Sequence, residues 1–238
     1  MNKKVVCVIP ARGGSKVIPK KNLVDFCGKP LIAHTIEVAL ASQFIEKVYV
    51  STDCQETASV SRAYGAICPQ LRPSKFAEDW STDKEVFVDF VKTLEMYESL
   101  PDYLVHLRCT TPNRDPLMID DSIQRLISSS GYTSLRSFCV ASKSPYKMWS
   151  DDGTGMLKPL LHLEIDGEDK EFFNQGRQSL PVVYEQDPYI DIYSVSYILS
   201  GRGLTGDRVL PFYLPKKSID IDTLDDLKYA RLNQTRDV

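Results

Sequence analysis

The stretch VVCVIPARGGSKVIPKKN, residues 5–22, decides the fold. Its first part, Val5 to Ile9, is a continuous apolar run of the kind that parallel sheets bury on both faces. Its second part is a polar loop, in which Gly13 and Gly14 permit a sharp turn whose backbone N–H groups can face an anion. The loop also carries four cations within ten residues, namely Arg12, Lys16, Lys20 and Lys21. Ligands of open α/β sheets bind outside the carboxyl ends of the strands, so this loop predicts a polyphosphate site.

The glycine spacing of this loop excludes two other nucleotide sites. It matches neither G-x-G-x-x-G nor G-x-x-x-x-G-K-[ST], so neither an NAD-dependent dehydrogenase nor a Walker-type ATPase is supported. On the spacing alone, a basic turn that faces solvent remains the alternative to a phosphate site.

Outward from this stretch, strand-like runs alternate with helical ones. Pro30 can occupy the first turn of a helix, and the apolar residues that follow it to Leu40 have helical spacing. The later segments repeat this rhythm: strand-like 48–51, a helix–strand unit ending near 66–68, an apolar helical face over 86–94, strand-like 103–107, 134–140 and 209–214, and a closing helix over 224–232. The order predicts an α/β fold with a mostly parallel sheet and helices on both faces.

The rhythm breaks between residues 143 and 178. This stretch is rich in Asp, Glu, Lys and Gly, and it is too long for a plain loop in a compact domain. We interpret it as a small inserted lobe within a single domain of residues 1–238. Its apolar residues suit either a homodimer contact or a surface flap: Met156, Leu157, Leu160, Leu161, Leu163 and Ile165.

The amino-acid composition excludes several classes of protein. The 238 residues are 42% hydrophobic and 26% charged, which is ordinary globular composition. The formal net charge of −3 gives no basic field for nucleic acid. No apolar run approaches the roughly 18 residues that span a bilayer. The sequence therefore predicts a soluble, cytoplasmic protein without nucleic-acid or membrane partners.

A second chemical signal is SIDIDTLDD, residues 218–226. Asp220 and Asp222 are two positions apart and, in an extended segment, point to the same face. Mg²⁺ prefers oxygen ligands and keeps several waters, so one or two carboxylates suffice for it. Thr223 has the features of a helix N-cap, with Asp225 and Asp226 in the first turn, and helix capping alone is the alternative for these acids.

A phosphate loop and a carboxylate pair on one α/β sheet indicate phosphoryl or nucleotidyl transfer, which needs charge neutralisation and in-line positioning. This interpretation requires the turn near the start of the chain and the acids near its end to meet at a single triphosphate.

The same stretches resemble the signatures of the CMP-sugar synthetases, in particular the acylneuraminate cytidylyltransferases. The resemblance covers nearly the whole chain, and its motifs keep their order: VIPARGGSKVIPKKNL at 8–23, Ser-Thr-Asp at 51–53, Leu-Arg-Pro at 71–73, Ala-Glu-Asp at 77–79, Thr-Thr-Pro at 110–112, Arg-Gln at 177–178 and Ile-Asp-Ile-Asp-Thr at 219–223. It implies a Rossmann-like nucleotidyltransferase domain with an inserted dimerisation lobe. It also implies that CTP and a nonulosonic, sialic-acid-like sugar give a CMP-sugar and pyrophosphate.

Residue roles follow from this resemblance. It implies Arg12, Lys21 and Asp222 as catalytic residues and Asp220 and Asp222 as Mg²⁺ ligands. The implied CTP-binding residues are Arg12, Gly13, Gly14, Ser15, Lys21, Asn22, Arg72, Thr82 and Asp83. The implied sugar-binding residues are Arg108, Lys147, Arg177, Gln178 and Tyr184.

The chain departs from the family pattern at two places. Arg108 stands where the family commonly has Gln, and residues 185–191, Glu-Gln-Asp-Pro-Tyr-Ile-Asp, replace an Asn-Gly-Ala segment. Both departures fall on the sugar side. A CMP-Kdo-type or CMP-legionaminate-type synthetase, or a nucleotide-binding relative without catalysis, therefore stays open.

Overall fold

The chain divides into two compact units. The computed structural model describes residues 3–161, 164–165, 168–169 and 171–234. Unit 1 comprises residues 1–137, 187–212 and 218–238, and unit 2 comprises residues 138–186 and 213–217. The lobe expected at 143–178 lies within unit 2.

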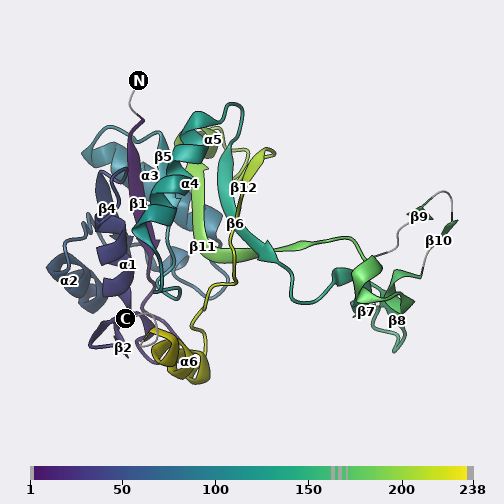
Figure 1. Cartoon of the computed structure of the whole chain (residues 1–238). Coiled ribbons are helices and arrows are strands. Elements are labelled where there is room, and N and C mark those ends of the chain that lie inside the picture. Colours follow the sequence, from purple (N-terminus) through teal and green to yellow (C-terminus); the bar gives the residue numbers. More distant parts are fainter. Residues whose placement is uncertain (1–2, 162–163, 166–167, 170, 235–238) are drawn as a thin grey trace. The chain divides into compact units, whose positions relative to one another are not determined.

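A six-stranded sheet with the order β12-β6-β11-β5-β1-β4 forms the framework (Figure 1). Its strands are β1 (Val5–Pro10), β4 (Lys47–Ser51), β5 (Tyr103–His106), β6 (Ser134–Val140), β11 (Tyr184–Ser194) and β12 (Val209–Tyr213). β1 pairs in parallel with both β4 and β5, whereas β11 runs antiparallel to β5. The first residues of β1 are fully buried, as their unbroken apolar pattern predicts.

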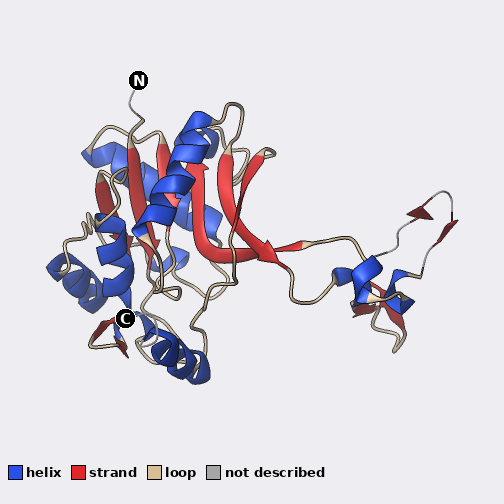
Figure 2. Ribbon diagram, in the orientation of Figure 1, coloured by secondary structure: helices blue, strands red, loops and turns tan. Residues whose placement is uncertain are grey.

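Helices cover both faces of this sheet (Figure 2). They are α1 (Leu31–Leu40), α2 (Gln55–Ala63), α3 (Asp83–Tyr97), α4 (Pro116–Ser128), α5 (Val195–Leu199) and α6 (Leu224–Gln234). α1 contacts α4 on one face, and α3 contacts α5 on the other. The largely parallel α/β fold predicted from the sequence is thus confirmed.

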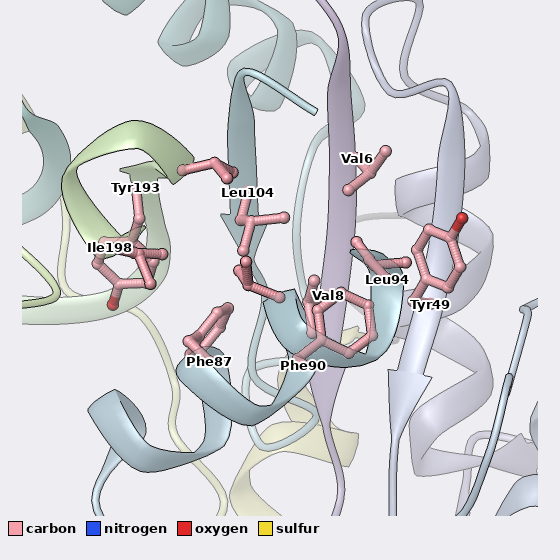
Figure 3. Close-up of a cluster of buried hydrophobic side chains, with 11 residues drawn as sticks. Val6, Val8, Tyr49, Phe87, Phe90, Leu94, Leu104, Tyr193 and Ile198 are labelled. Carbon is pink, nitrogen blue, oxygen red and sulfur yellow. The ribbon is translucent and has the colours of Figure 1, made fainter. Parts of the chain in front are cut away.

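One core cluster shows why α3 lies where it does (Figure 3). Phe87, Phe90 and Leu94 recur at helical spacing and are at most 3% exposed. They pack against residues of β1, β4, β5, β11 and α5, among them Val6, Val8, Tyr49, Leu104, Tyr193 and Ile198. Thr82 caps the helix, because its hydroxyl accepts the N–H of Glu85 while the Glu85 carboxylate accepts the N–H of Thr82.

The remaining elements are short. Unit 1 adds η1 (Lys21–Leu23), the pair β2 (Asp25–Phe26) and β3 (Lys29–Pro30), and η2 (Ser74–Phe76). Unit 2 contains η3 (Pro145–Lys147), the hairpin β7 (Trp149–Asp151) with β8 (Leu157–Pro159), the pair β9 (Glu164–Ile165) with β10 (Glu168–Asp169), η4 (Phe172–Asn174) and η5 (Arg177–Ser179). Leu163 lies outside the described residues.

Helices α4 and α5 and the long strand β11 were not anticipated. β11 carries Asp187, Pro188 and Asp191, which interrupt the apolar pattern that marks a buried strand. The two acids are nevertheless fully buried, because each has hydrogen-bond donors around it. No described helix has the length and apolar character needed to cross a bilayer.

Arg114 fastens the loop after β5 to β11. Its buried guanidinium donates to the carbonyl oxygens of Tyr189, Pro188, Arg108 and Thr111. Burial lowers the pKa of Arg114 to about 10, which leaves it cationic at neutral pH. A single side chain thus replaces regular strand pairing beyond the end of β5.

The loop after β1 has no room for a side chain at Gly13. The Gly13 N–H donates to Asp53 Oδ1 at 2.8 Å, and a Cβ at Gly13 would lie 2.8 Å from the Cβ of Cys54. Gly14, its neighbour, has nothing within 4 Å of such an atom.

We therefore expect Gly13→Ala to destabilise the protein by about 1–3 kcal/mol, the usual cost of overpacking. Thermal denaturation measures this, with about 2–4 °C of Tm lost per kcal/mol. Gly14→Ala is the matched control and should leave Tm nearly unchanged. Equal shifts in both variants would contradict the steric explanation.

Candidate active site

The loop after β1 is held at the carboxyl end of that strand. The Ala11 N–H donates to the Ser51 carbonyl oxygen at 2.9 Å, which continues the β1–β4 pairing beyond the strand end. The buried Asn22 donates through Nδ2 to the carbonyl oxygen of Arg12, also at 2.9 Å, and so draws the two ends of the loop together. Lys20 turns the chain with a left-handed φ of 51°, which is uncommon for a residue other than glycine.

This loop forms part of a cavity of about 240 Å³ at the carboxyl ends of β1 and β5. Such a position is where open α/β sheets bind their ligands. The cavity is lined by Pro10, Ala11, Arg12, Ser15, Lys21, Asn22, Asp83, His106, Arg108, Cys109 and Thr110. Six predicted site residues therefore lie around one hollow: Arg12, Ser15, Lys21, Asn22, Asp83 and Arg108.

Lys21 joins the start of the chain to its end. Its ammonium lies 2.9 Å from Asp222 Oδ1 and donates to the Ile221 carbonyl oxygen at 3.1 Å. The Ile221 N–H in turn donates to the Thr110 carbonyl oxygen at 2.8 Å. The expected meeting of the glycine-containing loop and the C-terminal acids is thus confirmed, and the loop after β5 meets both.

The two predicted metal ligands differ in their surroundings. Asp220 has a buried Oδ1 without a hydrogen-bond partner, whereas the side chain of Asp222 is 70% exposed and pairs with Lys21. A buried carboxylate oxygen without a donor is costly unless a cation or water satisfies it, so Asp220 fits a hard cation such as Mg²⁺. Among the described residues there is no group of three or more His, Cys, Asp or Glu arranged for a metal.

The next two acids, Asp225 and Asp226, make their contacts within the first turn of α6. The Asp226 carboxylate accepts the Thr223 N–H at 2.8 Å, and Thr223 Oγ1 accepts the Asp226 N–H at 3.2 Å. Asp225 lies in the same first turn and pairs with Lys228. The capping interpretation is thus confirmed for Asp226, whereas Asp225 makes an exposed ion pair within the helix.

The cations of the phosphate loop carry exposed partners. Arg12 Nη1 lies 3.0 Å from Asp79 Oδ1 and donates to the Glu78 carbonyl oxygen, and Lys16 pairs with the same Asp79. These ions hold the pKa of Asp79 below its usual range, with the Lys16 hydrogen bond as the largest cause. Exposed ion pairs contribute little free energy, so a polyanion can displace Asp79 from Arg12.

Other predicted CTP residues lie outside the cavity lining. The Thr82 hydroxyl is engaged in the capping of α3, so its expected base-reading role competes with a structural one. Arg72 is buried, its Nε has no hydrogen-bond partner, and burial lowers its pKa. Gly13 and Gly14 shape the loop rather than line the hollow.

A buried charged network forms another wall of the cavity. Arg108 donates to Asp191, and His106 lies between the rings of Phe87 and Tyr193. Burial, with nearby arginines, holds the pKa of His106 well below its ordinary value, so it is neutral at physiological pH. Asp191 was not among the predicted site residues. The flanking Ile190 and Ile192 are the only local signal that could have identified it, because an acid buried among apolar residues requires a partner.

Four predicted sugar-binding residues belong to unit 2. Lys147 ends η3, and Arg177 and Gln178 form most of η5. Arg177 Nη2 donates to the Ser142 carbonyl oxygen at 2.8 Å, and the Tyr184 ring lies 4.6 Å from that of Tyr213.

Relatives extend over almost the entire chain. Pseudaminic acid cytidylyltransferase from Campylobacter jejuni is 27% identical, covering 96% of this chain and 95% of the relative. CMP-N,N'-diacetyllegionaminic acid synthase from Legionella pneumophila is 32% identical, covering 97% and 98% respectively. N-acylneuraminate cytidylyltransferase from Escherichia coli is 31% identical, covering 97% of this chain and 52% of the relative.

A solved structure shares the fold. CMP:2-keto-3-deoxy-manno-octonic acid synthetase, complexed with CTP, superposes with a TM-score of 0.72 at 18% identity, covering 99% of this chain and 100% of that chain. The family model described as Cytidylyltransferase matches residues 6–147, which include β1, its loop and the walls of the cavity. The chain belongs to the cytidylyltransferase family.

Proposed function

We propose that this protein transfers the cytidylyl group of CTP to a nonulosonic acid and releases pyrophosphate. The observation that carries the proposal is Lys21, whose ammonium lines the cavity and binds Asp222 and the Ile221 carbonyl. It places its own ammonium and the Asp222 carboxylate beside a hollow that is large enough for part of a nucleotide. The names of the relatives support the sugar class.

In the proposed reaction, the anomeric hydroxyl oxygen of the sugar bonds to the α-phosphorus of CTP. The bond from that phosphorus to the bridging oxygen of the β-phosphate breaks, pyrophosphate leaves, and the hydroxyl proton passes to solvent or to bound water. Arg12 and Lys21 bind the phosphates and offset their charge, while Ser15 and the backbone N–H groups of the loop orient them. Gly13, Gly14, Asn22, Arg72, Thr82 and Asp83 complete the proposed CTP site.

Asp220 and Asp222 are the proposed Mg²⁺ ligands. When bound, the ion supplies positive charge that stabilises the developing negative charge on the phosphates. The unpartnered Oδ1 of Asp220 supports this assignment, and Lys21 orients Asp222.

Lys147, Arg177 and Gln178 are proposed to bind the sugar acid, with Arg177 gripping its carboxylate. Tyr184 and Arg108 are proposed to contact the rest of the sugar. The cytoplasm is the proposed location, since activation with CTP takes place where the nucleotide is made.

The test of the function is release of pyrophosphate from CTP and Mg²⁺ with a panel of acids. The panel contains N-acetylneuraminic, legionaminic, pseudaminic and 2-keto-3-deoxy-manno-octonic acids. Release with one of the first three supports the proposal. A preference for the fourth indicates the Kdo-type alternative, and CTP binding without release for any acid indicates a relative that has lost catalysis.

Asp222→Asn should lower kcat by about 100-fold or more, because it removes charge at the reacting phosphate. The measurement is steady-state pyrophosphate release, with circular dichroism to verify folding. Asp225→Asn is the matched control, because Asp225 is 92% exposed in the first turn of α6 and should be dispensable. Full activity of Asp222→Asn would remove Asp222 from the metal site.

We further propose that unit 2 joins two copies of the chain. It exposes large apolar side chains over one short stretch, 39–63% accessible: Met148, Trp149, Met156, Leu157, Leu160 and Leu161. Patches of this kind mark protein interfaces. Sedimentation equilibrium should give twice the chain mass for the wild type and the chain mass for Leu157→Asp. A wild-type mass of a single chain would refute the homodimer.

A further inference from the structure

The two departures from the family pattern meet in space. Arg108 follows β5 and lines the cavity, and Asp191 lies in β11, which pairs with β5 so that Asp191 is opposite His106. Arg108 Nη1 donates to Asp191 Oδ2 at 3.0 Å. The unexpected cation and the unexpected acid are therefore partners, although 83 residues separate them in the sequence.

Asp191 is completely buried, and its carboxylate is fully hydrogen-bonded. Besides Arg108, it accepts from Arg136 Nε at 2.9 Å, Arg136 Nη2 at 3.3 Å and the Tyr193 hydroxyl at 3.2 Å. A buried carboxylate with this many donors holds its partners in fixed positions. The Asp191 carboxylate thus holds the guanidinium of Arg108 in a fixed position at the cavity wall.

The other half of the guanidinium faces Asp83. Arg108 Nη2 donates to Asp83 Oδ2 at 3.2 Å, and both side chains line the cavity. A polyphosphate at this wall would meet the Asp83 carboxylate, which repels it. A polar ligand without net negative charge at this point would instead find donors on Arg108 beside an acceptor on Asp83. This wall therefore suits an uncharged polar group, such as a hydroxyl or acyl group of the sugar beside the uncharged part of CTP, and the wall with Arg12 and Lys21 suits the phosphates.

We propose that Arg108 determines which sugar acid the enzyme accepts, and that Asp191 is its positioning residue. The inference rests on the proposed function, which it deepens. A glutamine amide both donates and accepts hydrogen bonds, whereas a guanidinium only donates. With Arg108 fixed, the sugar must present acceptor oxygens at this wall, such as a hydroxyl or an acyl carbonyl. A sugar group that can only donate hydrogen bonds finds no acceptor on the guanidinium.

The test measures kcat/KM for each acid of the panel, and the dissociation constant of CTP, in Arg108→Gln, Asp191→Asn and the double variant. Arg108→Gln should lower kcat/KM for the preferred acid by about 10- to 100-fold, the effect of losing a hydrogen bond from a charged group. It should leave CTP binding within about twofold. The ratio between the preferred acid and the others should shrink.

In the wild-type background, Asp191→Asn should also lower kcat/KM for the preferred acid and shrink its advantage over the other acids. In the Arg108→Gln background, the same change should have little further effect on that advantage. This non-additivity is the signature of a residue that acts through another. Arg136→Gln is the matched control, because Arg136 binds the same carboxylate but does not line the cavity. It should lower Tm and leave the preference among acids unchanged; Arg136→Lys replaces it if the glutamine variant does not fold.

An unchanged preference in Arg108→Gln, additive effects of the Asp191 and Arg108 changes, or an equal change of preference in the Arg136 variant would each overturn the proposal. Calorimetric titration of the acids into the CTP complex without Mg²⁺ separates this proposal from the function itself. Acids that bind the wild type but not Arg108→Gln, with no pyrophosphate released by either protein once Mg²⁺ is added, would uphold the sugar wall and refute the transferase. Pyrophosphate release by the wild type, together with unchanged binding of the acids to Arg108→Gln, would support the transferase and refute the role of Arg108.

Discussion

The candidate site depends on the ammonium of Lys21. Its side chain is only 17% exposed, and it binds Asp222 and the Ile221 carbonyl, about 200 residues later in the chain. A lysine so placed needs its polar partners, because a buried cation without them is costly. The apolar part of the junction is Ile221, which is fully buried with Ile18, Phe26 and Leu31 from the first 31 residues and with Leu227 and Ala230 from α6. Hydrophobic burial therefore brings the two ends together, and Lys21 sets their register.

This junction also explains why the cavity lies where it does. The Ile221 N–H binds the Thr110 carbonyl, so the loop after β5 is held by the same residue whose carbonyl holds Lys21. Arg114 fastens the other end of that loop to β11 through the backbone carbonyls of Tyr189 and Pro188. The loops after β1 and β5 are thus held by buried groups, while Arg12, which lines the hollow from the first loop, has an exposed acid as its ion-pair partner. Rigid backbone with displaceable ions suits a site that must exchange water and protein carboxylates for phosphates.

The parts of the fold and site that were predictable from the sequence are those encoded locally. The apolar run at residues 5–9, the helical spacing after Pro30 and the Thr223–Asp226 cap each involve residues within a few positions of one another. The cavity-lining residues of the first loop were also predictable, because a strand that leads into a glycine-containing basic loop has a known place in such sheets. The long strand β11 was not predictable, because Asp187 and Asp191 make its buried sequence resemble that of an exposed strand. The groups that donate hydrogen bonds to these acids include Ser218, Arg108 and Arg136, which are distant in the sequence.

Arg108 illustrates the same limit on the side of function. Considered alone, an arginine in place of the glutamine common in the family suggests a loss of substrate binding. With Asp191 fully buried behind it and Asp83 beside it, the cation is neutralised, and Arg136 and Tyr193 complete the hydrogen bonds of the shared carboxylate. The energetic cost of burying Asp191 is offset only while its donors are present, which ties the two sequence changes together. A chain with Asp191 but without Arg108 would keep only Arg136 and Tyr193 as side-chain donors to the buried carboxylate, and a chain with Arg108 but without Asp191 would leave the guanidinium without its buried partner. Arg108 and Asp191 therefore depend on each other, because the charge of each offsets the cost of burying the other.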